Sequence, residues 1–286
     1  MKLCALLSTA AVSAAMCLAA STASAQITGK VSLDGQAPEP KQISMAANPQ
    51  CAAAHPNPVL EESIVAGDGG ELANVVINVK APEGKELKGE MPKDPVVLDQ
   101  KGCQYVPHVV AMMVGQDLVI KNSDNFLHNV HSLAIDNTPF NFGQPTKDQK
   151  GASRGKDIKT AERFQIKCDV HPWMTIHVNA FEHPFFAVSN EKGEFSLPTK
   201  GLEDGKYTLE IWQETLAAEP MTKEVMVKGG KATVEEIKIP AKAAARGNAV
   251  EGDAKLASAK TGETKSCCTV KSKAQAIASA AAAAAK

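Results

Sequence analysis

Short runs of β-branched and aromatic residues, separated by turn residues, fill the sequence between residues 26 and 240. Gly, Pro, Asn or Asp bounds most of these runs, as is typical of strands joined by tight turns. No long stretch repeats its apolar residues with the period of an amphipathic helix. We therefore expect an all-β fold of the sandwich type. The clearest strands are expected at Ile27–Val31, Asn74–Val79, Val109–Val114, Asp117–Lys121, Phe164–Lys167, Thr175–Val178, Tyr207–Ile211 and Glu224–Val227.

The two ends of the chain differ in composition from this middle part. Residues 1–25 combine a positive start, an apolar Ala-rich stretch and a small-x-small ending, a pattern typical of a signal peptide. We expect cleavage near Ala25-Gln26 and a periplasmic or secreted protein, without a membrane span because no other run is long and apolar enough. Residues 241–286 are rich in Ala, Lys, Ser and Gly and contain no aromatic residue, so we expect a disordered tail.

Charge and cysteine content narrow the possible functions. The formal net charge is -1 and the basic residues are scattered, which argues against nucleic acid as a partner. Signal cleavage would leave an odd number of the seven cysteines in an oxidising compartment, where a thiol is usually paired or bound to metal. Cys267 and Cys268 lie in the tail, either as an exposed pair without a fixed role or as a secondary contact for a soft metal.

Two further cysteines, Cys51 and Cys103, lie in turn-rich segments. We expect a disulfide between them, which would close a long loop and restrain the unfolded chain. Cys168 then remains as a single thiol in the β-rich part of the chain.

The segment Phe164–Met174 contains the residues that indicate metal chemistry. An expected strand leads into Cys168, a tight loop contains His171 and Met174, and a strand resumes at Thr175. A thiolate, an imidazole and a thioether on one short loop favour copper over hard cations.

A second imidazole can come from residues 122–131, which follow an expected strand and contain both His128 and His131. Two imidazoles and the thiolate of Cys168 would form a trigonal plane, with Met174 as a weak axial ligand. This upstream segment can therefore bring the second imidazole to the loop.

These two segments together resemble the copper motif of the cupredoxins, the blue copper proteins, over roughly Val96 to Phe181. The Cys-x2-His-x2-Met spacing is similar to that of amicyanin rather than to the longer loop of plastocyanin, and His-Asn-Val-His upstream strengthens the likeness. In that family the first histidine of the upstream segment is the ligand. The resemblance therefore implies a Greek-key β-sandwich with one type 1 copper per chain, whose ligands would be His128, Cys168, His171 and Met174.

Other residues receive supporting or neutral roles. The resemblance gives Asn129 the role of holding the ligand loops together by backbone hydrogen bonds. Trp173 should pack beside His171, where it could screen the metal or form part of an apolar docking patch. His131 is expected to be a surface or packing residue, and His108 to make a structural hydrogen bond; the remaining histidines, His55, His177 and His183, are neutral positions.

Three alternatives for Cys168 compete with copper. A lone cysteine in a β-sandwich is usually a small buried hydrophobe. A zinc site is disfavoured because methionine is a poor zinc ligand. A nucleophilic Cys–His pair would leave Met174 unexplained and lacks an evident orienting carboxylate.

The C-terminal strands carry a second resemblance, to the transthyretin-like regulatory domain of carboxypeptidases. It rests on Phe186–Leu197 and Leu202–Leu209, with Gly193 and Gly205 expected to provide the turn geometry. The opening pattern of that family is similar to Ile27–Gly35 and Asn74–Val79. This implies a split sandwich, as in exported proteins of the methylamine-utilisation type, with an N-terminal part at 26–92, a cupredoxin domain at 93–182 and a C-terminal part at 183–240.

The cupredoxin resemblance implies a one-electron carrier rather than an enzyme. His171 would be the partly exposed edge through which electrons pass, and a periplasmic dehydrogenase or a cytochrome would be the redox partner. Two other hypotheses stay open: copper binding for storage, delivery or sensing, and a structural or surface role for the β-protein.

Overall fold

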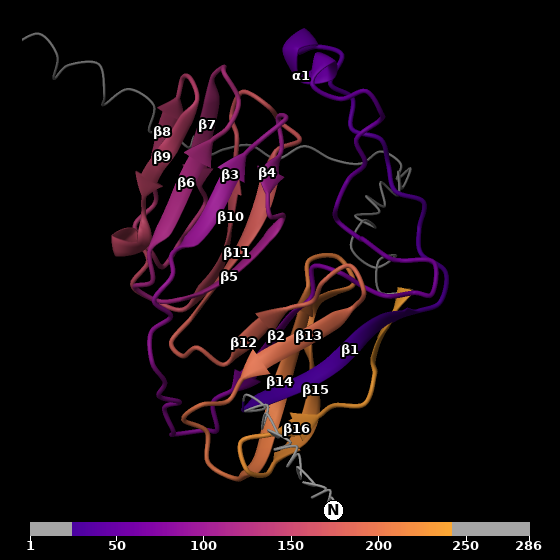
Figure 1. The fold of residues 1–286 in the computed structure, drawn as a ribbon, viewed down its shortest axis with the longest axis vertical. Helices are drawn as coiled ribbons and strands as arrows, with labels where there is room; N and C mark the ends of the chain where they lie inside the picture. Colours follow the sequence, from indigo (N-terminus) through magenta and orange to yellow (C-terminus); the bar gives the residue numbers. More distant parts are fainter. Residues whose placement is uncertain (1–24, 242–286) are drawn as a thin grey trace, which may run out of the picture. The chain divides into compact units, whose positions relative to one another are not determined.

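The computed structural model describes residues 25–241, in which strands form four sheets (Figure 1). The expected all-β fold is confirmed, and each of the eight clearest expected strands overlaps an observed strand. Among these residues, no helix is long and apolar enough to cross a membrane. The expected signal peptide and tail, with Cys267 and Cys268, lie outside the described residues except at their inner ends.

The middle of the chain forms one β-sandwich, here called the inserted sandwich. One of its sheets has the order β5-β11-β10-β7-β8 and the other has the order β4-β3-β6-β9. The neighbours β5/β11 and β3/β6 are parallel, which requires Greek-key crossovers rather than a simple meander. The strands are β3 Val96–Gln100, β4 Tyr105–Val106, β5 Val109–Met113, β6 Leu118–Asn122, β7 His128–Ser132, β8 Asn141–Gln144, β9 Asp148–Ser153, β10 Glu162–Lys167 and β11 Thr175–Phe181, with a 3-10 turn at Gly155–Asp157.

The strands before and after this region pair with one another in a second sandwich, here called the flanking sandwich. Strand β1 pairs with β13, β16 and β17, and β2 lies between β12 and β14. Its likeness to transthyretin-like domains stays a prediction. The strands are β1 Gln26–Asp34, β2 Val76–Lys80, β12 Phe186–Val188, β13 Glu194–Pro198, β14 Gly205–Gln213, β15 Ala217–Val227, β16 Ala232–Thr233 and β17 Ile237–Pro240.

Each sandwich has its own apolar core, because alternate residues of its strands face inward. In β6 and β7, buried and half-buried residues alternate strictly. Ile120, Val130 and Ile166 are fully buried in the inserted sandwich, and Ile77 and Leu209 are fully buried in the flanking one.

The segment between β1 and β2 extends from the flanking sandwich to the inserted one. It contains the short helix α1, Pro49–Ala53, and buries Met45 and Cys51 in the core of the inserted sandwich. Part of the expected N-terminal segment at 26–92 therefore belongs to the packing of the inserted sandwich.

Only one of the two glycines expected to shape turns does so. Gly193 has a φ of +68° in the turn before β13, and a Cβ there would lie 2.2 Å from the carbonyl oxygen of Val31. Gly205 begins β14, where a Cβ would meet no atom within 4 Å. The expectation for Gly205 is therefore wrong, because its backbone does not have the positive φ that favours glycine in a turn.

Candidate metal centre

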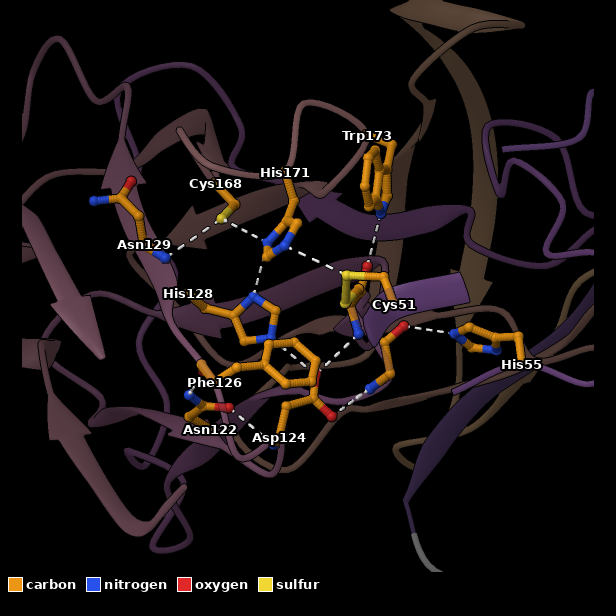
Figure 2. The surroundings of a disulfide bond; sticks show 12 residues. Cys51, His55, Asn122, Asp124, Phe126, His128, Asn129, Cys168, His171 and Trp173 are labelled. Atoms are coloured by element: carbon orange, nitrogen blue, oxygen red, sulfur yellow. Dashed lines mark hydrogen bonds and ion pairs between the residues drawn. A yellow bond between two sulfur atoms is a disulfide. The ribbon is translucent and has the colours of Figure 1, made fainter. Parts of the chain in front are cut away.

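Three potential ligand atoms converge at one end of the inserted sandwich (Figure 2). Nδ1 of His128 lies 3.0 Å from Nδ1 of His171, and Sγ of Cys168 lies 3.6 Å from the same His171 nitrogen. All three residues are buried. They come from the first residue of β7, the residue after β10, and the loop before β11.

The loop between β10 and β11 contains three of the four expected ligands. These strands pair antiparallel up to Lys167 and Thr175. The backbone N–H of Cys168 donates to the carbonyl of Met174 at 3.0 Å, and the N–H of Met174 donates to the carbonyl of His171 at 2.9 Å. Met174 is buried in the same core as Cys168. The spacing of the motif therefore produces a closed turn that holds Cys168 and His171 together.

Strand β7 decides which upstream histidine can join this group. Successive side chains of a strand point to opposite faces, so His128 and His131, three positions apart, face opposite sides. His128 is fully buried, whereas His131 lies at the surface, where its Nδ1 contacts Asp169 at 2.9 Å. The structure therefore brings His128 to Cys168 and His171 and leaves His131 outside.

The second ring nitrogen of His128 has a carboxylate partner that the sequence did not reveal. Nε2 of His128 donates to Oδ2 of Asp124 at 2.8 Å, and Asp124 also accepts the backbone N–H groups of Gly102 and Cys103. Burial acts to raise the pKa of Asp124, but these hydrogen bonds outweigh it and lower the pKa. An acidic residue four positions before a ligand histidine was the available signal.

The second ring nitrogen of His171 faces the disulfide. Cys51 and Cys103 are joined as expected, and Sγ of Cys51 lies 3.4 Å from Nε2 of His171. His171 is only 2 % exposed. The expected partly exposed edge at His171 is therefore wrong, because the segment that includes α1 is pinned to Cys103 and covers the imidazole.

Asn129 and Trp173 both contact this group. The backbone N–H of Asn129 donates to Sγ of Cys168 at 3.3 Å, and its side-chain oxygen accepts the N–H of Asp169 at 3.1 Å. The indole N–H of Trp173 donates to the carbonyl of Cys103 at 2.9 Å, and its ring centroid lies 5.4 Å from that of His171. Asn129 thus joins β7 to the ligand loop, and Trp173 joins that loop to the disulfide.

The hydrogen bonds around Cys168 favour its thiolate form. Burial acts to raise the pKa of Cys168, but hydrogen bonds from His128 and from nearby backbone N–H groups outweigh it and lower the pKa. Burial lowers the pKa of His171, and the neighbouring charge of His128 lowers it further. Cys168 is the one free cysteine among residues 25–241.

Hydrogen bonds assign the proton on each imidazole. Nε2 of His128 carries the proton that it donates to Asp124, so Nδ1 is the nitrogen that can bind a metal once it has lost its own proton. A disulfide sulfur has no proton to donate, so Nε2 of His171 carries one and its Nδ1 keeps the lone pair. The Nδ1 atoms of both imidazoles and the sulfur of Cys168 therefore face one point, where a bound cation would take the place of the proton on His128 Nδ1.

Comparisons with known proteins identify partial similarity in structure. No protein-family model and no curated protein sequence matches the chain. Among solved structures, the chain is similar to amicyanin from Paracoccus versutus, with 20% identity over 36% of this chain and 98% of that chain, and a TM-score of 0.25. A purple cupredoxin from Nitrosopumilus maritimus has 18% identity over 30% of this chain and 99% of that chain, with a TM-score of 0.25.

A larger protein also matches. The copper-containing nitrite reductase from Thermus scotoductus SA-01 has 21% identity over 36% of this chain, with a TM-score of 0.26, and the match spans only 25% of the reductase. These similarities are low, so the choice of metal rests on the ligand geometry described above.

Proposed function

We propose that this chain is a type 1 copper protein that carries one electron at a time, with one copper ion per chain. The ligands would be His128, Cys168, His171 and Met174. The observation that supports this most directly is the convergence of two imidazole Nδ1 atoms and the sulfur of Cys168 on a single buried point.

The distances between these atoms suit a shared metal ion. Nitrogen and sulfur ligands at about 2.0 to 2.3 Å from one ion lie about 3 to 4 Å from each other. The separations of 3.0 Å and 3.6 Å from His171 Nδ1 fall in this range. Two imidazoles, a thiolate and a nearby thioether form a soft ligand set that favours copper over zinc or harder cations.

The surroundings of the ligands favour electron transfer. Copper bound here would supply a reversible one-electron couple between Cu(II) and Cu(I). Asp124 holds His128, the disulfide covers His171, and Asn129 donates to the thiolate. Because these contacts restrain the ligands, little rearrangement would accompany a change of charge.

The same burial argues against copper delivery. A protein that passes copper to a partner needs ligands that the partner can reach. His128, Cys168 and His171 are each no more than 2 % exposed. Enzymatic activity is also disfavoured, because four protein ligands would leave no open position for a substrate.

We propose a periplasmic or secreted location and a redox protein as partner, either a periplasmic dehydrogenase or a cytochrome. Rapid mixing of the oxidised copper protein with a reduced cytochrome tests this. Electron transfer would bleach the copper absorption while the haem spectrum changes to its oxidised form. Unchanged spectra with cytochrome and with dehydrogenase would contradict the proposed partners.

The copper proposal is tested by the optical and electron-spin spectra of the purified protein loaded with Cu(II). We expect strong absorption at about 600 nm from thiolate-to-copper charge transfer, and its loss on reduction. Cys168→Ser should abolish this absorption. The double variant Cys267→Ser, Cys268→Ser is the matched thiol control and should keep it.

Two other results would contradict the proposed function. A colourless protein that binds only Cu(I) would contradict electron transfer and favour delivery or storage. Failure to retain copper at all would overturn the metal assignment and favour a structural role.

A further inference from the structure

A second cluster of metal-binding side chains lies outside the candidate copper centre. Nε2 of His108 lies 2.7 Å from Oε1 of Glu214, and Nε2 of His177 contacts the other oxygen of the same carboxylate. These donor atoms all lie within 4.8 Å of one another. The sequence had indicated only a structural hydrogen bond for His108 and no role for His177.

These residues meet because β5 and β11 run side by side in parallel, which places His108 beside His177. Glu214 follows β14 of the flanking sandwich, so the cluster draws on both sandwiches. All three side chains are between 12% and 16% exposed. Strands from both sandwiches therefore fix the positions of the three groups.

A cavity of about 580 Å³ opens beside the cluster. Its lining includes His108 and Glu214, together with the second carboxylate Glu62. The ring of Trp212, which belongs to a small apolar cluster, packs against His177 with centroids 5.3 Å apart. The cluster thus has an apolar neighbour at His177 and room for further ligands beside His108 and Glu214.

Burial acts to lower the pKa of His108, but the hydrogen bond and the charge of Glu214 outweigh it and raise the pKa. Burial acts to raise the pKa of Glu214, but its contacts with both imidazoles lower it to about 2, so it is a carboxylate. Burial raises the pKa of Glu62, and the charge of Glu214 adds to this while His108 opposes it. A divalent cation bound to Glu214 would favour the ionised form of Glu62.

We propose that His108, His177 and Glu214 bind a divalent first-row transition metal ion such as Zn²⁺, separate from the copper centre. Two imidazoles and one carboxylate form a common zinc ligand set, with the remaining position open to solvent or substrate. Here that position faces the cavity, where Glu62 can bind the ion or hold a metal-bound water.

The test measures zinc binding by calorimetry to the full chain loaded with copper, so that zinc cannot occupy the site at Cys168. The Cys267→Ser, Cys268→Ser background removes the tail thiols. We expect one zinc ion per chain. His177→Gln and Glu214→Gln should each weaken binding at least about tenfold, since even residues behind the ligands change affinity by that amount. His131→Gln, which removes a surface imidazole outside both sites, should not.

Equal zinc binding by all these variants would overturn the proposal, as would the absence of zinc binding in the background protein. Zinc-edge X-ray absorption adds a readout that does not depend on the variants. Scattering from two imidazoles is expected, and scattering from sulfur would contradict the assignment. If copper does not bind, the same titration in a Cys168→Ser background keeps the test independent of the proposed function.

Discussion

Nε2 of His171 lies 3.4 Å from Sγ of Cys51, so a disulfide covers the one imidazole that the ligand loop would otherwise expose (Figure 2). Sequence positions far apart thus meet at the candidate metal centre. The bond ties α1 to Cys103, whose backbone N–H is bound by Asp124. Because Asp124 also accepts from His128, the disulfide is linked to both imidazoles.

Removal of this disulfide is expected to destabilise the protein and expose the metal. The bond closes a loop with a sequence separation of 52 residues. For a loop of this length, the chain-entropy model predicts that the double variant Cys51→Ala, Cys103→Ala loses about 4 kcal/mol of unfolding free energy. Denaturant unfolding measures this loss, and a chelator should extract copper faster. An unfolding free energy equal to that of the wild type would contradict the expected role.

Matched variants on β7 distinguish the two upstream histidines. His128→Gln should remove the absorption at about 600 nm, because it deletes a ligand in the trigonal plane. His131→Gln should leave the band in place, because that side chain faces the surface and contacts Asp169. Optical spectra of both proteins with equal copper provide the measurement. The reverse result would transfer the ligand role to His131.

Asp124→Asn should weaken copper binding while preserving the fold. The amide keeps one oxygen acceptor but removes the charge that orients His128, and changes of this kind cost about 10- to 100-fold in metal affinity. Competition with a chelator measures the affinity. Asp136→Asn, at an exposed turn outside the site, is the control and should have no effect. Equal affinities in both variants would show that Asp124 does not support the metal.

Some of the site could be predicted from the sequence because its geometry is local. The spacing of Cys168, His171 and Met174 sets a tight turn between two recognisable strands, and this turn is observed. The choice of His128 needed the cupredoxin resemblance, since composition alone did not separate it from His131. The strand alternation in the structure now gives a physical reason for that choice.

Other features depend on contacts between distant segments, so they could not be predicted from the sequence. The cover over His171 arises from α1, which no local pattern places near the ligand loop. The cluster at Glu214 joins strands of two sandwiches. Strands β8 and β9 were missed because they are polar edge strands, whose residues lack the β-branched pattern of the central ones.

Tyr105→Phe should reduce stability by about 1 kcal/mol, the usual net contribution of a hydrogen bond. The buried hydroxyl donates to the carbonyls of Asn129 at 2.6 Å and Lys167 at 3.3 Å, next to two expected ligands. Tyr207→Phe is the matched control, because its hydroxyl makes an exposed hydrogen bond to Glu203. Thermal unfolding of both variants measures the difference, and a larger loss for Tyr207→Phe would contradict this assignment.

Glu162 is expected to contribute to the loss of stability in acid. Burial acts to raise its pKa, but the backbone N–H groups of Ile135 and Asn137 and the Asn137 side chain outweigh it and lower the pKa from the usual 4.5. A lowered pKa means that the stabilisation is fully present above pH 4.5 and is lost as the pH falls through the folded-state value. Glu162→Gln should therefore unfold at a lower temperature than the wild type at neutral pH, and the two curves should converge in acid. Glu191→Gln, at an exposed turn residue, is the control, and its unfolding temperature should equal that of the wild type at every pH. If Glu162→Gln instead lowers the unfolding temperature by the same amount at every pH, the loss comes from packing and not from the charge.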